Sequence, residues 1–436
     1  MSARGFAAGA AALLLASTSA HAAVEVQWWH AMRTELGRQL QKLAADFNAS
    51  QAEYRIVPVY KGQYTETLSA AIVALRTRQH PAILQVAEVA TATMMAAKGA
   101  VYPVFELMRD QGERFDPSAY LPAVTSYYTD LDGNILSLPF NASTPILYYN
   151  KDQLRAAGFD AETPPKTYPE LEAMGYRLRA AGVRCGFTGH WPSWVHIENF
   201  SALHNLPLAT MANGFGGLDT ELAINNAAVV RHVDKLAEWQ KTKVFDYGGR
   251  ATAADPKFVN GECAIFLGSS AQRAELLAGA KFEVGYGMLP YWPDVAGAPQ
   301  NSIIGGATLW VLKGRPPAEY KGVAEFFAFL SRPAVQAWWH QNTGYLPITR
   351  AAYELTRTRG FYARNPGADI AIEQLSLKPA TDNSRGLRLG SFVLVRDVIE
   401  DELEQAIAGR KSAQAALDAA VARGNDLLRQ FEKANR

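Results

Sequence analysis

The order of predicted strands and helices constrains this fold most, because the two kinds of element alternate along the chain. Residues 24–28 alternate apolar and polar side chains, which predicts an opening strand. Apolar residues then recur at helical spacing over residues 36–47, and residues 54–60 predict a second strand. Residues 82–86 form a short apolar run, typical of a buried parallel strand. This alternation predicts a doubly wound α/β fold.

The length of the chain favours two lobes. At 436 residues, it exceeds what one hydrophobic core usually organises. Its composition is that of an ordinary globular protein, with 48% hydrophobic and 19% charged residues, and it has no Gly/Ser-rich linker or internal repeat. We therefore expect two interlaced lobes rather than two domains joined by a linker.

The first 22 residues have the pattern of a secretory signal peptide. Arg4 gives a positive start, residues 6–16 form an apolar run, and small residues surround a cleavage point at Ala20-His-Ala22. The apolar run is shorter than the ~20 residues that a membrane span requires. No cysteine follows the cleavage point directly, so we expect no lipid anchor there. We predict that residues 1–22 are removed and that the mature protein is soluble and periplasmic.

The charge balance argues against two classes of partner. Loss of residues 1–22 removes one arginine and no acid, which leaves 42 basic and 42 acidic residues. Binding to nucleic acid requires a basic surface, and an anionic membrane attracts basic segments. A formally neutral chain therefore predicts neither partner.

Signatures of catalysis and of metal binding are missing from the sequence. It contains no Gly-x-Ser-x-Gly, His-Glu-x-x-His, Walker or Cys-x-x-Cys motif, and its eight histidines lack metal-ligand spacing. We therefore predict no enzyme activity, no cofactor and no metal. Cys185 and Cys263 allow either one disulfide or two buried thiols, and both alternatives stay open at this point.

Several long motifs follow one another along the chain. They are Val57-Pro-Val-Tyr-Lys-Gly62, Ala82-Ile-Leu-Gln-Val86, Thr91-Ala-Thr-Met-Met95, Ser143-Thr-Pro-Ile-Leu-Tyr-Tyr-Asn150, Ile303-Ile-Gly-Gly306, Thr343-Gly-Tyr-Leu-Pro-Ile-Thr349 and Gly386-Leu-Arg-Leu-Gly390. In these motifs the chain resembles the glycerol-3-phosphate-binding subunits of ABC importers, within the extracellular solute-binding proteins that include maltose-binding protein. The resemblance runs from the end of the signal peptide almost to the C-terminus.

The resemblance implies a fold and a set of partners. The fold would have two α/β lobes, a hinge that the chain crosses several times, and a ligand cleft between the lobes. Residues 23–131 and 286–332 would form lobe I, and residues 132–285 and 333–436 would form lobe II. The protein would be a monomer that delivers a small-molecule ligand to an inner-membrane permease and its ATPase.

Seven residues match the family's ligand contacts position by position. They are Tyr64, Glu88, Ser143, Ser269, Gly306, Tyr345 and Arg396. Hydroxyl groups and backbone N–H groups in polar turns bind phosphate oxygens, and the guanidinium of Arg396 would add a planar fork for the phosphate. Glu88 would accept hydrogen bonds from glycerol hydroxyls. The alternative for Arg396 is a structural salt bridge with Asp397, Glu400 or Asp401.

Two tryptophans also match a family segment, within Gly189-His-Trp191-Pro-Ser-Trp194. Trp191 would stack on the glycerol, and Trp194 would face a choline cation. Three neighbouring residues depart from the family pattern: Ser193 replaces a glycine, Ala87 a tyrosine and Ala142 a serine. We expect these changes to affect the exact ligand more than the ligand class.

Three functions follow as alternatives. The first is a binding protein for sn-glycerol-3-phosphate or for glycerophosphodiesters such as glycerophosphocholine, with no preference between them indicated by the sequence. The second is a binding protein for a neutral, maltose-like oligosaccharide, which would have no use for the charge of Arg396. The third is a secreted phosphodiesterase, which would require a metal cluster or a nucleophile–base pair.

Overall fold

The computed structural model describes residues 22–130 and 132–436. The predicted signal peptide, except for Ala22, lies outside the described residues. Among the helices of the described part, none is long and apolar enough to span a membrane.

The first sheet has six strands, and five of them follow the order β2-β1-β3-β10-β4, with β5 also paired to β10. Strand β1 runs parallel to β2 and β3, whereas β10 runs antiparallel to its three neighbours. The strands are β1 (Val24–His30), β2 (Tyr54–Tyr60), β3 (Ile83–Ala87), β4 (Val101–Tyr102), β5 (Leu138–Ser143) and β10 (Gly305–Leu312).

The second sheet has four strands in the order β7-β8-β6-β9. Strand β7 is parallel to β8, and β6 is antiparallel to both β8 and β9. The strands are β6 (Pro145–Asn150), β7 (Cys185–Gly189), β8 (Cys263–Ser269) and β9 (Val284–Gly287).

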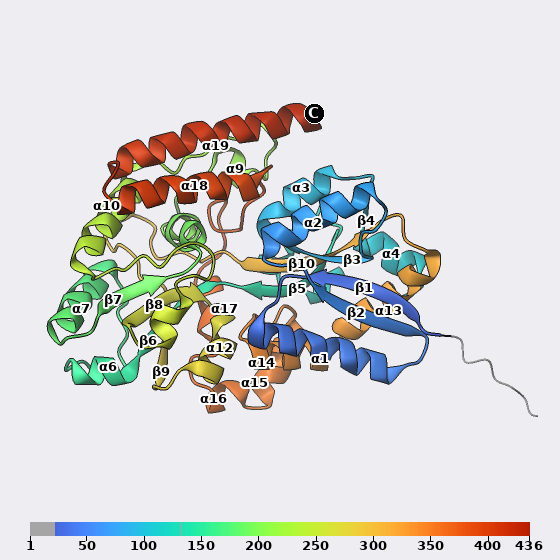
Figure 1. The fold of residues 1–436 in the computed structure, drawn as a ribbon, viewed down its shortest axis with the longest axis horizontal. Coiled ribbons are helices and arrows are strands. Elements are labelled where there is room, and N and C mark those ends of the chain that lie inside the picture. Colours follow the sequence, from blue (N-terminus) through green and yellow to red (C-terminus); the bar gives the residue numbers. More distant parts are fainter. Residues whose placement is uncertain (1–21, 131) are drawn as a thin grey trace, which may run out of the picture.

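Helices surround both sheets, and the two sheets with their helices lie side by side along the long axis of the molecule (Figure 1). The first helix is amphipathic, as predicted: Leu40, Leu43 and Phe47 are buried. The helices are α1 (Thr34–Ser50), α2 (Tyr64–Arg76), α3 (Thr91–Ala96), α4 (Val104–Asp110), α5 (Pro122–Thr125), α6 (Lys151–Ala156), α7 (Tyr168–Ala180), α8 (Phe200–Leu203), α9 (Thr210–Asn213), α10 (Ala227–Thr242), α11 (Asp255–Val259), α12 (Gln272–Gly279), α13 (Pro317–Leu330), α14 (Pro333–Thr343), α15 (Arg350–Thr358), α16 (Phe361–Arg364), α17 (Ile370–Leu375), α18 (Phe392–Ile407) and α19 (Ala413–Asn435).

The chain passes between the sheets more than once, which matches the predicted interlacing. It leaves the first sheet after β5, enters the second at β6, and returns from β9 to β10. The exact lobe limits stay a prediction. The assignment of strands to the two sheets differs from the predicted lobe limits at two points. Strand β5 pairs with β10 of the first sheet, and β9 pairs with β6 of the second. By this criterion the crossings fall between Ser143 and Pro145 and between Gly287 and Gly305, whereas the predicted limits follow residues 131 and 285.

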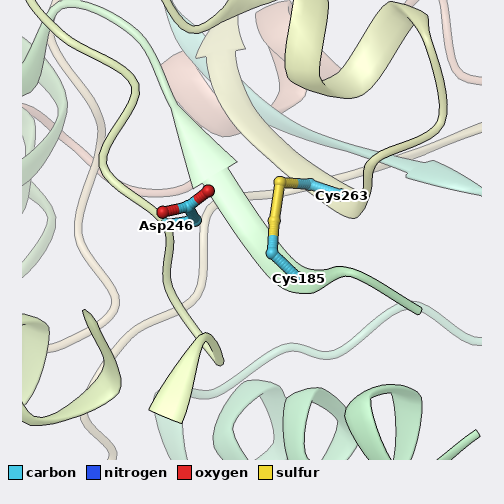
Figure 2. A group of neighbouring side chains, drawn as sticks. All are labelled: Cys185, Asp246 and Cys263. Atoms are coloured by element: carbon cyan, nitrogen blue, oxygen red, sulfur yellow. A yellow bond between two sulfur atoms is a disulfide. The ribbon is translucent and has the colours of Figure 1, made fainter. Parts of the chain in front are cut away.

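A disulfide joins Cys185 to Cys263, which decides the alternative that the sequence left open. The two residues are direct partners in the register of β7 and β8, with their Cα atoms 4.5 Å apart. Asp246 lies beside the two sulfur atoms (Figure 2), and its carboxylate is paired with Lys243 and Lys257. Because the sulfur atoms are bonded to each other, they are not thiolate ligands for a metal.

The disulfide is expected to stabilise the second sheet by restricting the unfolded chain. It closes a loop between residues separated by 78 positions. Replacement of both cysteines by alanine should lower the free energy of unfolding by about 2–4 kcal/mol. Urea denaturation with and without a thiol reductant measures this, with the double alanine variant as a control that must not respond to reductant. Equal stability of the variant and the oxidised protein would contradict the prediction.

Buried histidines of the second lobe predict acid sensitivity. Burial lowers the pKa of His196 to about 3 and that of His204 to about 4, from an ordinary value of 6.5. The unfolded chain therefore binds more protons than the folded chain below pH 6.5. The stability that these groups contribute is fully present above pH 6.5 and is lost as the pH falls from there towards 4. Unfolding free energies measured from pH 7.5 to 4.5 should decline in this range; a flat profile would contradict the assignment.

Candidate ligand-binding site

A cavity of about 1120 Å³ lies between the two sheets, and its walls come from both of them. All nine predicted ligand-binding residues line this cavity, although they come from segments up to 332 positions apart in the sequence. They are Tyr64, Glu88, Ser143, Trp191, Trp194, Ser269, Gly306, Tyr345 and Arg396.

The ends of strands supply the polar part of the first wall. Glu88 follows β3 directly, and Ser143 is the last residue of β5. Gly306 lies on β10, beside the end of β5. Its φ of +105° is rarely adopted by other residues, and a Cβ atom there would lie 1.9 Å from the carbonyl oxygen of Asn141. Only glycine therefore fits at this position of the wall.

A chain of hydrogen bonds orients the hydroxyl group of Tyr64. The Ala31 N–H donates to Gln85 Oε1 over 2.8 Å, and Gln85 Nε2 donates to Asn141 Oδ1 over 2.8 Å. Asn141 Nδ2 in turn donates to the Tyr64 hydroxyl oxygen over 3.1 Å. Burial raises the pKa of Tyr64 to about 12, so the hydroxyl keeps its proton. Because its oxygen already accepts from Asn141, that proton is free to donate to a ligand.

Ser269, the last residue of β8, is held in a fixed orientation. The Ser269 N–H donates to His190 Nε2 over 2.7 Å, and His190 Nδ1 lies 2.8 Å from the carboxylate of Asp255. Nε2 is thus the acceptor, and Nδ1 donates its proton to Asp255. We predicted a polar turn here whose backbone N–H groups bind phosphate; the N–H of Ser269 is instead bonded to His190. The Ser269 hydroxyl lines the cavity and remains a candidate donor.

Arg396 connects the two lobes through a pair of glutamates. Its side chain, on α18, is 12% exposed. Nε and Nη2 donate to the two carboxylate oxygens of Glu198 over 2.8 and 2.6 Å, and Nη2 also donates to Glu88 over 3.1 Å. For Arg396, the alternative to phosphate binding was a salt bridge with Asp397, Glu400 or Asp401. A salt bridge is present, but the predicted partners were wrong, because the guanidinium reaches Glu198 and Glu88 instead of the acids on its own helix.

Two carboxylates therefore share one guanidinium. Burial raises the pKa of Glu88, and the carboxylate of Glu198 adds to this effect while Arg396 opposes it. Nη1 of Arg396 makes no hydrogen bond with the described residues. The two glutamates already balance the positive charge of the guanidinium. A ligand anion that binds here would accept hydrogen bonds from Nη1 only.

The two tryptophans differ in how much of the ring is available. Trp191 is half-buried, whereas Trp194 is only 5% exposed. The ring of Trp194 packs on Gly305, where a Cβ atom would lie 2.5 Å from the ring. Trp191 is thus the more accessible aromatic side chain of the cavity, and Trp194 mainly fills the space behind the strand.

Sequence reasoning missed Glu198 and Asn141. Glu198 is 1% exposed and lies in a π-helical segment, Trp194–Asn199, a geometry that is frequent at functional sites. Its Oε1 also accepts a hydrogen bond from the hydroxyl of Ser193 over 3.0 Å, one of the residues that depart from the family pattern. The sequence did contain a signal for Glu198, because this acid lies within a largely apolar segment. A buried acid needs a cationic or hydrogen-bonding partner, and this need could have pointed to Arg396. Asn141 gave no such signal, because its role depends on β5 pairing with β10.

Contacts between the lobes also close one edge of the cavity. The carboxylate of Glu275, on α12, accepts hydrogen bonds from the Thr34 hydroxyl and, over 3.1 Å, from the Glu35 N–H at the start of α1. Arg33 donates to the Thr252 hydroxyl over 2.6 Å. The N-cap residue of α1, Arg33, does not cap the helix with its own side chain. The opposite lobe thus supplies the acceptor that this helix start lacks.

Relatives of similar length share about half of the residues. A protein from Pectobacterium atrosepticum, named sn-glycerol-3-phosphate-binding periplasmic protein UgpB, is 50% identical over 431 residues, which covers 99% of this chain and 97% of the relative. The protein of the same name from Salmonella typhimurium is 51% identical over 427 residues, covering 98% and 97%. The predicted resemblance is confirmed.

Solved structures share the fold. UgpB from Mycobacterium tuberculosis in complex with glycerophosphocholine matches with a TM-score of 0.78 at 21% identity, over 93% of this chain and 98% of that one. Maltose-bound MalE3 of T. maritima matches with a TM-score of 0.74 at 20% identity, over 93% and 100%. These matches confirm the predicted two-lobed α/β fold class. Residues 42–368 match the family of bacterial extracellular solute-binding proteins, and the chain belongs to this family.

Proposed function

We propose that this chain is the periplasmic solute-binding subunit of an ABC importer for sn-glycerol-3-phosphate, glycerophosphodiesters such as glycerophosphocholine, or both. The observation that carries the proposal is that all nine expected contacts line one cavity. They do so in a chain about half identical to proteins named for binding sn-glycerol-3-phosphate. Residues 1–22 serve as the signal peptide, and the partners are the inner-membrane permease and its ATPase. The protein acts as a monomer.

Uncharged donors hold most of the phosphate in this proposal. The hydroxyl groups of Tyr64, Ser143, Ser269 and Tyr345 and the N–H of Gly306 donate to its oxygens, and Nη1 of Arg396 adds one charged donor. Burial keeps the pKa of Tyr345 well above its usual value, so this hydroxyl keeps its proton, which it would turn from Met32 Sδ, 3.6 Å away, towards the phosphate. Glu88 accepts hydrogen bonds from the glycerol hydroxyls. Contacts that a ligand makes to both lobes favour the closed state through its differential affinity for that state.

The site supports binding better than catalysis. Ser269, His190 and Asp255 lie in contact, which resembles a nucleophile–base–acid arrangement. His190 Nε2, however, accepts the backbone N–H of Ser269 and not its hydroxyl proton. The serine is therefore not activated as a nucleophile, and we propose no hydrolysis of glycerophosphodiesters. Turnover of glycerophosphocholine by the purified protein would contradict this.

Arg396 is the residue that separates the proposed ligand from a neutral oligosaccharide. Arg396→Ala should weaken binding of glycerol-3-phosphate by ~1.5–3 kcal/mol, the scale of a charged hydrogen bond. Isothermal titration calorimetry of the ligand-stripped protein measures the affinity. A thermal melt must accompany it, because the variant leaves Glu88 and Glu198 without their cation. A folded variant with unchanged affinity, or a wild-type protein that binds maltotriose and no glycerol phosphate, would overturn the proposal.

The Glu275 contact is expected to stabilise the closed state. Glu275→Ala removes the acceptor for Thr34 and Glu35 and should weaken solute binding by about 1 kcal/mol, the scale of a helix cap. Glu275→Gln, which keeps an acceptor oxygen, is the matched control and should lose less. Calorimetry gives the affinities, and small-angle scattering of the unliganded variants reports the mean opening. Affinities equal to wild type would show that the contact does not contribute to closure.

A further inference from the structure

Glu400 is a buried carboxyl group in the cavity wall, and the described part of the chain gives it no partner. It is 5% exposed and lines the cavity, and it makes no hydrogen bond or salt bridge with the residues that the structure describes. A carboxylate removed from water without a partner is costly to the fold. Asp397, one turn earlier on α18, also lines the cavity without such a bond, and it is exposed at the rim. We call these two residues the acidic wall.

The nearby cations are already occupied. Arg396 is held by Glu88 and Glu198. Arg250, on the loop before α11, is held by Asp401 over 2.6 Å and by Glu404 over 2.7 Å. Burial raises the pKa of Glu400 to about 7; Glu198 and Asp397 also raise it, whereas Arg396 and Arg250 lower it. The described residues thus leave the acidic wall with a surplus of negative charge.

An aromatic ring lies on the same side of the cavity. The backbone N–H of Trp191 donates to the Ala251 carbonyl over 2.9 Å, which holds the backbone of Trp191 beside the loop that carries Arg250. Trp191 lines the cavity and is half-buried. An aromatic face and a carboxylate together suit a quaternary or primary ammonium group, because both attract a cation and neither requires a specific hydrogen-bond geometry from it.

We propose that Glu400 and Asp397, together with Trp191, form a subsite for the cationic head group of a zwitterionic glycerophosphodiester. The proposal rests on the proposed function and narrows it to diesters that carry an ammonium group. Glu400 lies four residues after Arg396, about 6 Å further along α18. Both side chains line the cavity, so a ligand with its phosphate at Arg396 and a two-carbon spacer would place its ammonium group on the Glu400 side. A phosphomonoester brings two negative charges and no cation to the same wall.

The charge of Glu400 therefore affects the two ligands in opposite directions. Glu400→Gln keeps the shape of the side chain and removes its charge. At pH 8, the variant should bind glycerophosphocholine about ten-fold more weakly, the scale of one partly desolvated charge pair. It should bind glycerol-3-phosphate more tightly, since a repulsive carboxylate is gone. Glycerophosphoglycerol, a diester with an uncharged head group, should not bind more weakly. Calorimetry with these three probes gives the comparison.

Glu402→Gln is the matched control, on the same helix. Glu402 is also buried, but it is paired with Lys411 and Arg423 and does not line the cavity. It should leave all three affinities unchanged. Asp397→Asn, at the exposed rim, should act in the same direction as Glu400→Gln but more weakly, which provides a second variant if Glu400→Gln proves unstable in a thermal melt.

The outcomes separate this proposal from the proposed function. If the wild-type protein binds glycerophosphocholine and both variants bind it equally well, the head-group subsite is wrong and the proposed function stands. If Glu400→Gln weakens all three probes by the same factor, Glu400 has only a structural role and the subsite is again wrong. If the wild-type protein binds none of the probes, both proposals fall.

Discussion

The ion cluster of Glu88, Arg396 and Glu198 is the interaction on which the arrangement of the cavity depends. It links the end of a strand in the first sheet to α18 and to the π-helical segment of the second lobe. A buried guanidinium is tolerated only with such partners, and each carboxylate needs the guanidinium in turn. In the arrangement that the structure shows, the cluster therefore holds the two walls of the cavity against each other. The cluster has two carboxyl groups and one guanidinium, so its net charge is negative. This charge favours the binding of ligands that carry a cationic group.

The sequence predicted the wall residues better than it predicted their connections. Tyr64, Glu88 and Ser143 were identified because the family resemblance carries over residue by residue within short local motifs, and all three line the cavity. Pairing between Arg396 and Glu198 joins residues 198 positions apart, which periodicity does not encode. The same reason explains the cysteines: their pairing follows from the register of β7 and β8. The number of sheets and the membership of β5 likewise depend on long-range strand pairing.

The cavity obtains its polarity from two different physical sources. On the first wall, Tyr64, Ser143 and Gly306 supply neutral dipoles that are oriented by strand ends and by buried amide side chains, and Glu88 adds one carboxyl group. On the side of α18, the groups are charged, and their pKa values are shifted by burial and by one another. A ligand with a neutral end, a central anion and a cationic end would match this sequence of environments from one side to the other.

The hydrogen-bond chain from Ala31 through Gln85 and Asn141 to Tyr64 has a consequence for the working conditions of the protein. Uncharged donors that are pre-oriented in this way hold an anion through short-range dipoles, and mobile ions screen such contacts far less than they screen exposed charge pairs. The share of the affinity that these neutral donors supply should therefore vary little with ionic strength. A receptor outside the cytoplasmic membrane meets the salt concentration of its surroundings, and neutral donors of this kind keep their contacts with a ligand in dilute and in concentrated media.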